Sequence, residues 1–308
     1  MEYEYMKDMN PRTATVYKSQ MRKMCANLDV EFFEDVFYNH IEELDKYIED
    51  IENINTRKNY LACIVTFIRN TPEIASDTLI KYRTQMLGLC ATLNNVAKSQ
   101  TKSATQEDKW TTLNQLQDIR KKQLKTIKNK AEPSWQDIQP FIVSSLYLAD
   151  DLNPPIRNEY GDMVVVNEKD QIHITDKTRN YLVITGRNKK TFILNDYKTA
   201  KSYGQKQFKV GNKLNKIINM FIDKHPINTG QEPEAPLLLN SANKMMGRNA
   251  LTKYLTKHLN ISTAMLRHIY ISEKVGGPML KQKEDLAEKM CHSTTLQEEY
   301  KKDLTQGC

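Results

Sequence analysis

The chain of 308 residues has only ten glycines and ten prolines, the residues that are abundant in the turns of β-rich proteins and in disordered proteins. Its 39% hydrophobic, 27% charged and 8% aromatic content lies in the globular range, which disfavours a disordered chain, a collagen and a jelly roll. No apolar run approaches the roughly 20 residues that cross a bilayer, and the N-terminus carries acids where a signal peptide carries bases. We therefore expect a protein that is neither secreted nor held in a membrane.

Cysteines and the common catalytic motifs are equally scarce. The cysteines are Cys25, Cys63, Cys90, Cys291 and Cys308. Their odd number, wide spacing and lack of a CxxC pair predict neither a disulfide framework nor structural zinc. The chain also lacks GxxxxGK[ST], GxGxxG, HExxH and GxSxG, so ATP, dinucleotide, zinc-hydrolase and serine-hydrolase chemistry have no motif support. We expect no cofactor and no metal site.

Charge is distributed unevenly along the chain. Residues 1–100 carry 12 Lys and Arg against 15 Asp and Glu, a balance of −3, whereas residues 101–308 carry 33 against 23, a balance of +10. A basic segment of that size favours a polyanionic partner, because phosphate contacts supply most of the non-specific affinity for nucleic acid. Solvated surface lysines would give the same balance, so charge alone leaves both interpretations open.

The first hundred residues have the three- and four-residue apolar spacing of helices. The expected helices start at Asn10-Pro11, at Phe33, at Asn55-Thr56 and at Ser76. The last of them carries an apolar stripe, expected to pack in a core, that consists of Leu79, Tyr82, Met86, Leu89, Leu93 and Val96. Residues 1–98 are therefore predicted to form a four-helix bundle.

A polar stretch, SQTKSATQED, separates this bundle from the rest, and residues 99–110 are predicted to be a linker because they can bury little apolar surface. Residues 111–308 form the second predicted domain, in which strand signals occur only in the middle. The expected strands are Met163–Val166, Tyr181–Thr185, Thr191–Leu194 and Gln207–Val210. The fold class that follows is mainly α with a small antiparallel β-sheet.

Five residues of the second domain are candidate catalytic residues because of their order and their local sequence settings. They are Arg157 in PPIRNEY, Lys198 in NDYKTAKSYG, Arg267 in MLRHIY, His292 in MCHSTT and Tyr300 in LQEEYKK. Their order and local settings resemble the tyrosine recombinase (phage integrase) family. The resemblance covers nearly the whole chain, because that family joins a helical core-binding domain to a catalytic α+β domain with a small sheet. It implies a core-binding domain at 1–98, a linker at 99–110 and a catalytic domain at 111–308.

The resemblance implies site-specific DNA cleavage and rejoining without metal or ATP. Two arginines suit a phosphorus centre whose oxygens gain charge, so Arg157 and Arg267 would hold the phosphate. His292 would donate a further hydrogen bond, and Lys198 would protonate the departing 5′ oxygen, with Lys201 as the alternative for that role. Tyr300 would be the nucleophile, and its 3′-phosphotyrosine would keep the energy needed for religation.

Two positions depart from the family pattern. Ala264 stands three residues before Arg267, where the family often has His or Lys, so the general base is open between water, the phosphate itself, His268 and Thr263. Cys291 stands where the family commonly has Gly before its histidine. The first departure keeps open a non-catalytic DNA-binding protein with a lapsed site. A type IB topoisomerase-like enzyme is a further possibility, because it resembles the same catalytic set.

Double-stranded DNA is the expected partner, in a host nucleus or cytoplasm, for an integrase or resolvase of a mobile element or virus. The family implies a monomer or weak oligomer in solution and a tetramer on DNA. The basic side chains expected to contact DNA phosphates are Arg22, Lys23, Arg57, Lys58, Lys201, Arg248 and Lys253.

Overall fold

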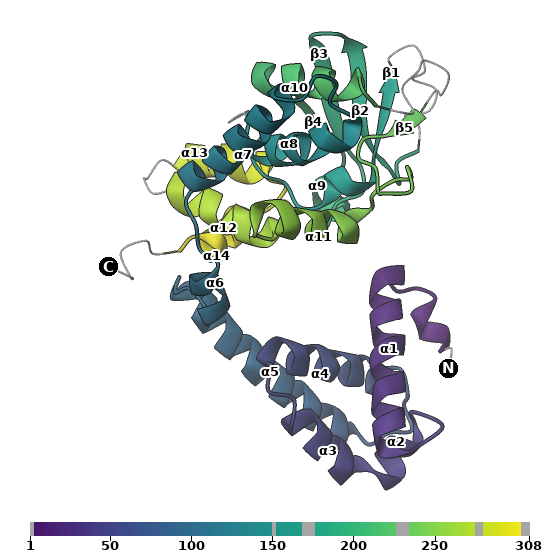
Figure 1. The fold of residues 1–308 in the computed structure, drawn as a ribbon. Helices are drawn as coiled ribbons and strands as arrows, with labels where there is room; N and C mark the ends of the chain where they lie inside the picture. Colours follow the sequence, from purple (N-terminus) through teal and green to yellow (C-terminus); the bar gives the residue numbers. More distant parts are fainter. Residues whose placement is uncertain (1–2, 150–151, 168–175, 226–233, 275–279, 303–308) are drawn as a thin grey trace. The chain divides into compact units, whose positions relative to one another are not determined.

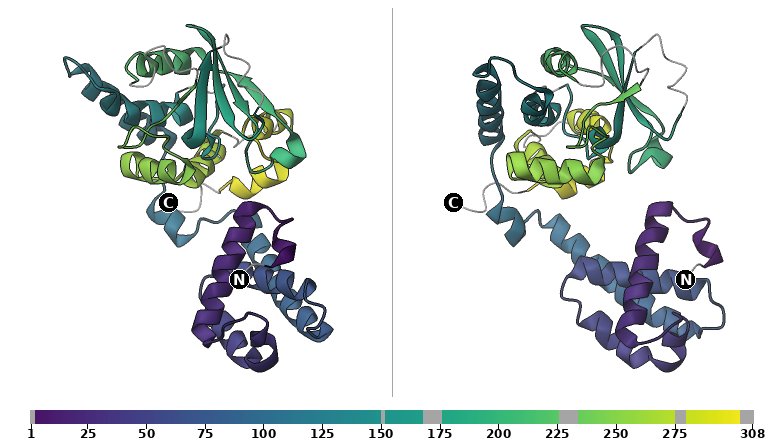
Figure 2. Two further views of the ribbon diagram at one scale, coloured as in Figure 1. Left: turned by 90° about the vertical axis from the view of Figure 1, so that its right-hand side faces the viewer. Right: turned by 45° about the vertical axis from the view of Figure 1, so that its right-hand side comes forward.

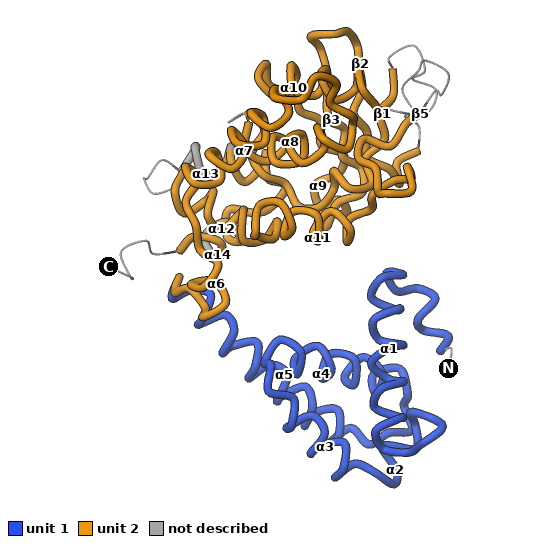
Figure 3. Tube along the Cα trace, in the orientation of Figure 1, with its two compact units in different colours: residues 1–99 blue, residues 100–308 orange. Residues whose placement is uncertain are grey.

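The computed structural model describes residues 3–149, 152–167, 176–225, 234–274 and 280–302. The chain divides into two compact units, Met1–Ser99 and Gln100–Cys308 (Figure 3). The helices and strands of both units are labelled in Figure 1. Among the described residues, no helix combines the length and apolarity needed to cross a bilayer.

Helices make up the first unit. In chain order they are η1 (Glu4–Met6), α1 (Pro11–Leu28), α2 (Asp35–Asn39), α3 (Ile41–Glu49), α4 (Ile54–Arg69) and α5 (Ser76–Lys98). The predicted start of α1 is confirmed, because the Asn10 side chain accepts a hydrogen bond from the backbone N–H of Arg12 at 3.0 Å. An aromatic cluster around Phe67, which contacts Tyr3, Phe33 and Phe37, lies in the core of this unit.

Two boundary predictions in this unit are wrong. The apolar run from Phe33 to Ile48 is split into α2 and α3 at His40, so the described unit has five α-helices and the short η1, whereas four helices were predicted. The helix expected to start at Asn55-Thr56 is capped two residues earlier by Asn53, whose Oδ1 accepts from Thr56 N at 3.0 Å. An asparagine two positions upstream offers the same capping chemistry, so local pattern alone does not choose between them.

The stripe on α5 packs against the core of this unit only from Leu79 to Leu89. Tyr82 is fully buried and donates a hydrogen bond to Asp45 at 3.0 Å, whereas Val96 at the other end is 57% exposed. The prediction that the whole stripe packs in a core is therefore wrong. The spacing of apolar residues specifies a helix face, and the length of the neighbouring helices decides how much of that face is covered.

The polar stretch after α5 is not without structure. A short helix, α6 (Ala104–Asp108), begins at a capping box in which Ser103 and Gln106 satisfy each other's backbone N–H groups. Capping residues order a few turns of chain without any buried apolar face. The prediction of an unstructured linker over 99–110 therefore has to be corrected for these residues.

The second unit combines helices with one sheet. Its helices are α7 (Leu113–Lys128), α8 (Trp135–Leu148), η2 (Glu159–Asp162), α9 (Ala200–Tyr203), α10 (Asn212–Ile222), α11 (Arg248–Leu259), α12 (Thr263–Lys274), α13 (Leu280–Lys289) and α14 (Thr294–Tyr300). Its strands are β1 (Met163–Asn167), β2 (Asn180–Gly186), β3 (Lys189–Leu194), β4 (Lys206–Lys209) and β5 (Glu234–Pro236). The mainly helical class with a small sheet is thus confirmed.

The sheet is mixed, which corrects the prediction of an antiparallel one. Its order is β4-β3-β2-β1-β5, with β1 parallel to β2 and the other pairs antiparallel. The tight turn at Arg187-Asn188 forces β2 and β3 to run antiparallel, whereas the dozen residues between β1 and β2 give the chain room to cross back. β5 was not predicted, since three residues give no periodic signal.

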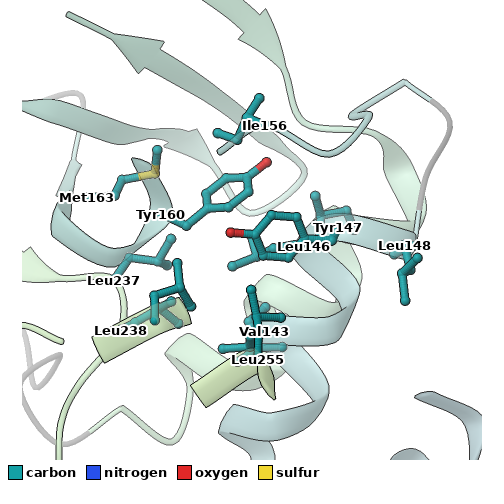
Figure 4. Close-up of a cluster of buried hydrophobic side chains, with 14 of the residues drawn as sticks. Val143, Leu146, Tyr147, Leu148, Ile156, Tyr160, Met163, Leu237, Leu238 and Leu255 are labelled. Atoms are coloured by element: carbon teal, nitrogen blue, oxygen red, sulfur yellow. The ribbon is translucent and has the colours of Figure 1, made fainter. Parts of the chain in front are cut away.

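The main core lies between the sheet and the helices on one of its faces (Figure 2). α8 is central to it, with α7, α10 and α11 packed around it. Alternate residues of β1 separate as a pleated strand requires: Met163 and Val165 join the main core, and Val164 and Val166 join a smaller cluster on the opposite face. Tyr147 and Tyr160 meet edge to face within the main core, 5.3 Å between ring centroids (Figure 4).

One close backbone contact joins η2 to α11, and it leaves no room for a methyl group on Gly161. Gly247 N donates to Gly161 O at 2.7 Å, and a Cβ on Gly161 would lie 2.6 Å from the carbonyl oxygen of Gly247. We expect Gly161→Ala to lower the free energy of unfolding by about 2 kcal/mol, because the overlapping atoms are backbone. Gly186→Ala, with open space around its Cβ, is the matched control and should change it by less than about 0.5 kcal/mol in urea denaturation. Equal effects would contradict this account.

Candidate active site

Arg267 is the most buried charged side chain among the residues of the second unit whose burial the structure describes. It lies on α12 and is 0% exposed, yet its Nη2 makes only a long hydrogen bond of 3.5 Å to Met290 O. Within the described residues its Nε and Nη1 have no acceptor. Burial lowers the pKa of Arg267 to about 10, so the group stays protonated at neutral pH. A buried guanidinium whose Nε and Nη1 have no acceptor is suited to binding an anion.

Tyr300 lies against this guanidinium. The ζ carbon of Arg267 is 4.9 Å from the centroid of the Tyr300 ring, and the His268 ring meets the same ring at 4.7 Å. The Tyr300 carbonyl is 2.8 Å from His268 Nδ1, and two residues later Lys302 N donates to Ser272 Oγ at 2.8 Å. The end of α14 is therefore held along α12, which places the tyrosine beside the unpaired arginine.

His292 also lies near Tyr300, with ring centroids 5.8 Å apart. Its Nδ1 is 2.9 Å from Ser293 O, and because a carbonyl only accepts, Nδ1 carries the proton. Nε2 is buried and has no partner among the described residues. Burial lowers the pKa of His292 to about 4, with a smaller contribution from the charges of Arg267 and Arg157. Nε2 is therefore unprotonated at neutral pH and would donate to an anion only after it takes up a proton.

The depressed histidine pKa values predict a pH dependence of stability. Burial also lowers the pKa of His268 to about 4, whereas an unfolded histidine titrates near 6.5. The folded state binds fewer protons, so its stability is present above pH 6.5 and is lost as pH falls toward 4. We expect urea denaturation at pH 7 and pH 5 to show this loss, and His292→Gln to reduce it. A wild-type stability that does not change across this range would contradict the buried neutral state.

Arg157 enters the same region from the segment between α8 and η2. Its carbonyl accepts a hydrogen bond from the Tyr147 hydroxyl at 2.9 Å, and the buried residues Asn153 to Ile156 fix the backbone before it. Its charge acts on both Arg267 and His292, where it lowers the pKa. Glu159 is also buried, and burial raises its pKa despite three nearby arginines. The group formed by Arg157, Arg267 and Glu159 therefore carries more positive than negative charge.

The segment that contains Lys198 reaches this cluster through its neighbour. Thr199 Oγ1 donates to Cys291 O at 2.9 Å, which ties the connection between β3 and β4 to the residue before His292. Lys198 and Lys201 are both exposed on this connection, so burial does not choose between the two lysines as general acid. Lys198 is the closer in sequence to the Thr199 anchor.

Sequence reasoning missed Lys206. At the start of β4 its Nζ lies 3.0 Å from Glu288 Oε1 and 5.9 Å from the Tyr203 ring centroid. With Cys291 and His292 it lines a cavity of about 330 Å³. Its place in the sequence, beyond the family-like YKT motif, gave no separate signal, because lysines are frequent throughout this stretch.

Cys291 explains one departure from the family pattern. Its φ is +54°, a left-handed conformation that glycine adopts without strain and that a side chain makes costly. We therefore expect Cys291→Gly to be more stable than Cys291→Ala by about 1 kcal/mol in thermal unfolding, the reverse of the usual order at a buried position. Both variants lose the thiol, so the comparison isolates the backbone. Alanine more stable than glycine would show that the backbone here is not strained.

The general base is not decided by position 264. Ala264 is exposed on α12, and an alanine side chain has no titratable group. His268 contacts the Tyr300 ring directly, whereas Thr263 is buried at the first residue of α12. His268 is neutral and next to the tyrosine, which keeps it a candidate base beside water and the phosphate itself. Among the described residues, no three His, Cys, Asp or Glu side chains gather in a metal-ligating group.

The expected DNA contacts fall into two groups. Arg22 and Lys23 on α1, Lys201 before β4 and Lys253 on α11 are exposed, and Lys58 on α4 is partly exposed. Arg57 instead donates to Ile51 O at 2.9 Å and Glu49 O at 2.7 Å, which joins the end of α3 to α4. Arg248 binds two carboxylates within the second unit. Both of these guanidinium groups serve contacts inside the protein.

A comparison with solved structures finds a distant likeness, whereas the sequence comparisons find none. No family model matches the chain, and no curated protein matches it in sequence. A solved structure of XerA recombinase is similar at a TM-score of 0.39 with 8% identity, over 98% of this chain and 91% of that one. At that level the likeness carries no argument about function, which has to come from the site itself.

Proposed function

We propose that this protein is a tyrosine recombinase that cleaves and rejoins duplex DNA through a 3′-phosphotyrosine. The observation that carries the proposal is the buried Arg267, whose Nε and Nη1 have no acceptor within the described residues, beside the ring of Tyr300. Leaving such a group unpaired costs stability, and a phosphate diester supplies the missing acceptors. Duplex DNA presents that group at every nucleotide.

Arg267, Arg157 and His292 would bind the non-bridging oxygens of the scissile phosphate. These oxygens gain charge as phosphorus becomes five-coordinate, so donors fixed in a buried site stabilise that state more than the ground state. His292 donates from Nε2 only when protonated, because its Nδ1 proton is already used on Ser293 O. Phosphate binding is therefore coupled to proton uptake at His292 under this proposal.

Tyr300 would attack phosphorus through its hydroxyl oxygen. The new bond joins that oxygen to phosphorus, the bond to the 5′ oxygen breaks, and the phenolic proton goes to His268 or to water. Lys198 would give a proton to the departing 5′ oxygen. The phosphotyrosine keeps a diester bond, so a 5′ hydroxyl from the same or another duplex reverses the step without ATP.

The first test uses DNA that needs no knowledge of the target sequence. A pool of duplexes with a randomised half-site, each with a nick that lets the cleaved 5′ end diffuse away, is incubated with the protein and EDTA. We expect a denaturant-resistant adduct whose tryptic peptide spans residues 290–301, in which Tyr300 is the only tyrosine. An adduct on another peptide would overturn the assignment of the nucleophile.

Two further outcomes distinguish the recombinase from its competitors. Binding to the pool without any adduct would favour the non-catalytic protein with a lapsed site. Relaxation of a supercoiled plasmid that carries the selected site, without exchange between two such duplexes, would favour the type IB topoisomerase-like enzyme. Exchange would support the recombinase and the tetramer on DNA that it implies.

A further inference from the structure

Arg248 connects two segments of the candidate site that are far apart in sequence. It is the first residue of α11, and its side chain is only 17% exposed. Its Nε donates to Asp162 Oδ2 at 2.5 Å, and its Nη2 donates to Asp196 Oδ2 at 2.9 Å and to Asp196 O at 2.7 Å. The planar fork thus serves two acidic residues in two directions, which a lysine cannot reproduce.

The Asp162 end of this connection fixes the segment of Arg157. Asp162 ends η2, which starts two residues after Arg157 and contains the buried Glu159. The contact between Gly161 and Gly247 brings the backbone of η2 against the residue before Arg248. The start of α11 and the first-arginine segment are therefore held as one piece.

The Asp196 end fixes the segment of Lys198. Asn180, which is buried, accepts the backbone N–H groups of Asn195 and Asp196 at 2.9 Å each and donates to Asp196 O at 2.9 Å. Lys198 therefore stands between two anchors, Asp196 on one side and Thr199, bonded to Cys291 O, on the other. An exposed lysine has its backbone held in this way although its own side chain is free to move.

We propose that Arg248 is a positioning residue for the leaving-group step, acting through Asp196 on Lys198, and not a contact to DNA phosphate. The inference rests on the proposed function. Its guanidinium already has two carboxylate partners, so it has little reason to bind phosphate. Loss of the Arg248 guanidinium would let Asp196 move and would thereby misplace Lys198, the proposed general acid.

The test compares two leaving groups in single-turnover cleavage. The first substrate is a nick-trapped duplex with an ordinary 5′ oxygen, and the second has sulfur at that bridging position. A thiolate leaves without protonation, so a misplaced general acid affects only the oxygen substrate. We expect Asp196→Asn and Arg248→Lys to slow oxygen cleavage by about 10- to 100-fold and sulfur cleavage by less than about threefold. Lys198→Ala should show the same selectivity.

Arg187→Gln is the matched control, because Arg187 forms an exposed ion pair with Asp223 in the same unit. It should change neither rate. Equal slowing of both substrates by Asp196→Asn would overturn the inference and leave a purely structural role. A weaker DNA affinity with a salt dependence reduced by one phosphate contact in the charge-removing variant Arg248→Met would also overturn it. No cleavage of either substrate by the wild type would instead refute the proposed function.

Discussion

We expect the replacement of Tyr300 with phenylalanine to abolish the proposed covalent attachment to DNA, with a loss of at least about 10⁴-fold in cleavage rate. The substitution removes one oxygen and keeps the ring that contacts Arg267 and His268. The donors proposed to hold the phosphate remain, so we expect duplex affinity to stay within about twofold of wild type. The free energy of unfolding should change by less than about 1 kcal/mol, because the ring contacts that hold position 300 are unchanged.

Tyr203→Phe is the matched control for this result. Tyr203 is 45% exposed and lines the cavity beside His292, so it tests whether any hydroxyl near the histidine would serve. The adduct is measured on denaturing gels, and binding is measured in parallel by fluorescence anisotropy. An adduct that persists in Tyr300→Phe would assign the nucleophile to another group. An adduct lost in Tyr203→Phe as well would show that the effect is not specific to position 300.

Arg267→Met should separate activity from stability. We expect cleavage to fall by about 10³-fold or more, since the buried donors to the developing charge are lost. The free energy of unfolding should nevertheless be unchanged or higher by about 1 kcal/mol in the absence of DNA. In wild-type Arg267 the buried Nε and Nη1 atoms have no acceptor within the described residues, and the shorter methionine removes that desolvated charge while filling much of its volume.

Arg248→Met is the contrasting variant for the stability measurement. Its guanidinium pairs with Asp162 and Asp196, and the replacement leaves both carboxylates without their partner. We expect a loss of about 2 kcal/mol, a value reduced because Asp196 is partly exposed. Urea denaturation of both variants at pH 7 makes the comparison. A loss above about 2 kcal/mol in Arg267→Met would mean that Arg267 is a structural cation paired within the protein, and the phosphate site would lose its main support.

The elements that could be predicted from sequence are those in which a local signal decides the structure. Ser134 begins α8 with a reciprocal capping box to Asp137, and Asn10 with Pro11 begins α1. Helix-period spacing identified the longer helices of the first unit, and β-branched runs identified β1 to β4. These predictions succeeded because caps, turns and periodicity act within a few residues of the chain.

Other elements depend on partners that the local pattern does not contain. The parallel pairing of β1 with β2 and the addition of β5 follow from how the chain returns to the sheet. The exposed end of α5 depends on where neighbouring helices stop. Arg248 was expected to contact DNA from its charge and position, whereas its observed hydrogen bonds are to Asp162 and Asp196, which are 86 and 52 residues away.

The sequence by itself determined the class of the fold, the type of chemistry its ordered residues resemble and the position of each candidate in the chain. Only the tertiary structure decided that Arg267 is buried without enough acceptors, that Tyr300 lies against it and that Cys291 has a left-handed backbone. The physical reason is desolvation. Whether a charge is costly or ordinary depends on what surrounds it, and the surroundings of Arg267 come from segments separated by more than a hundred residues.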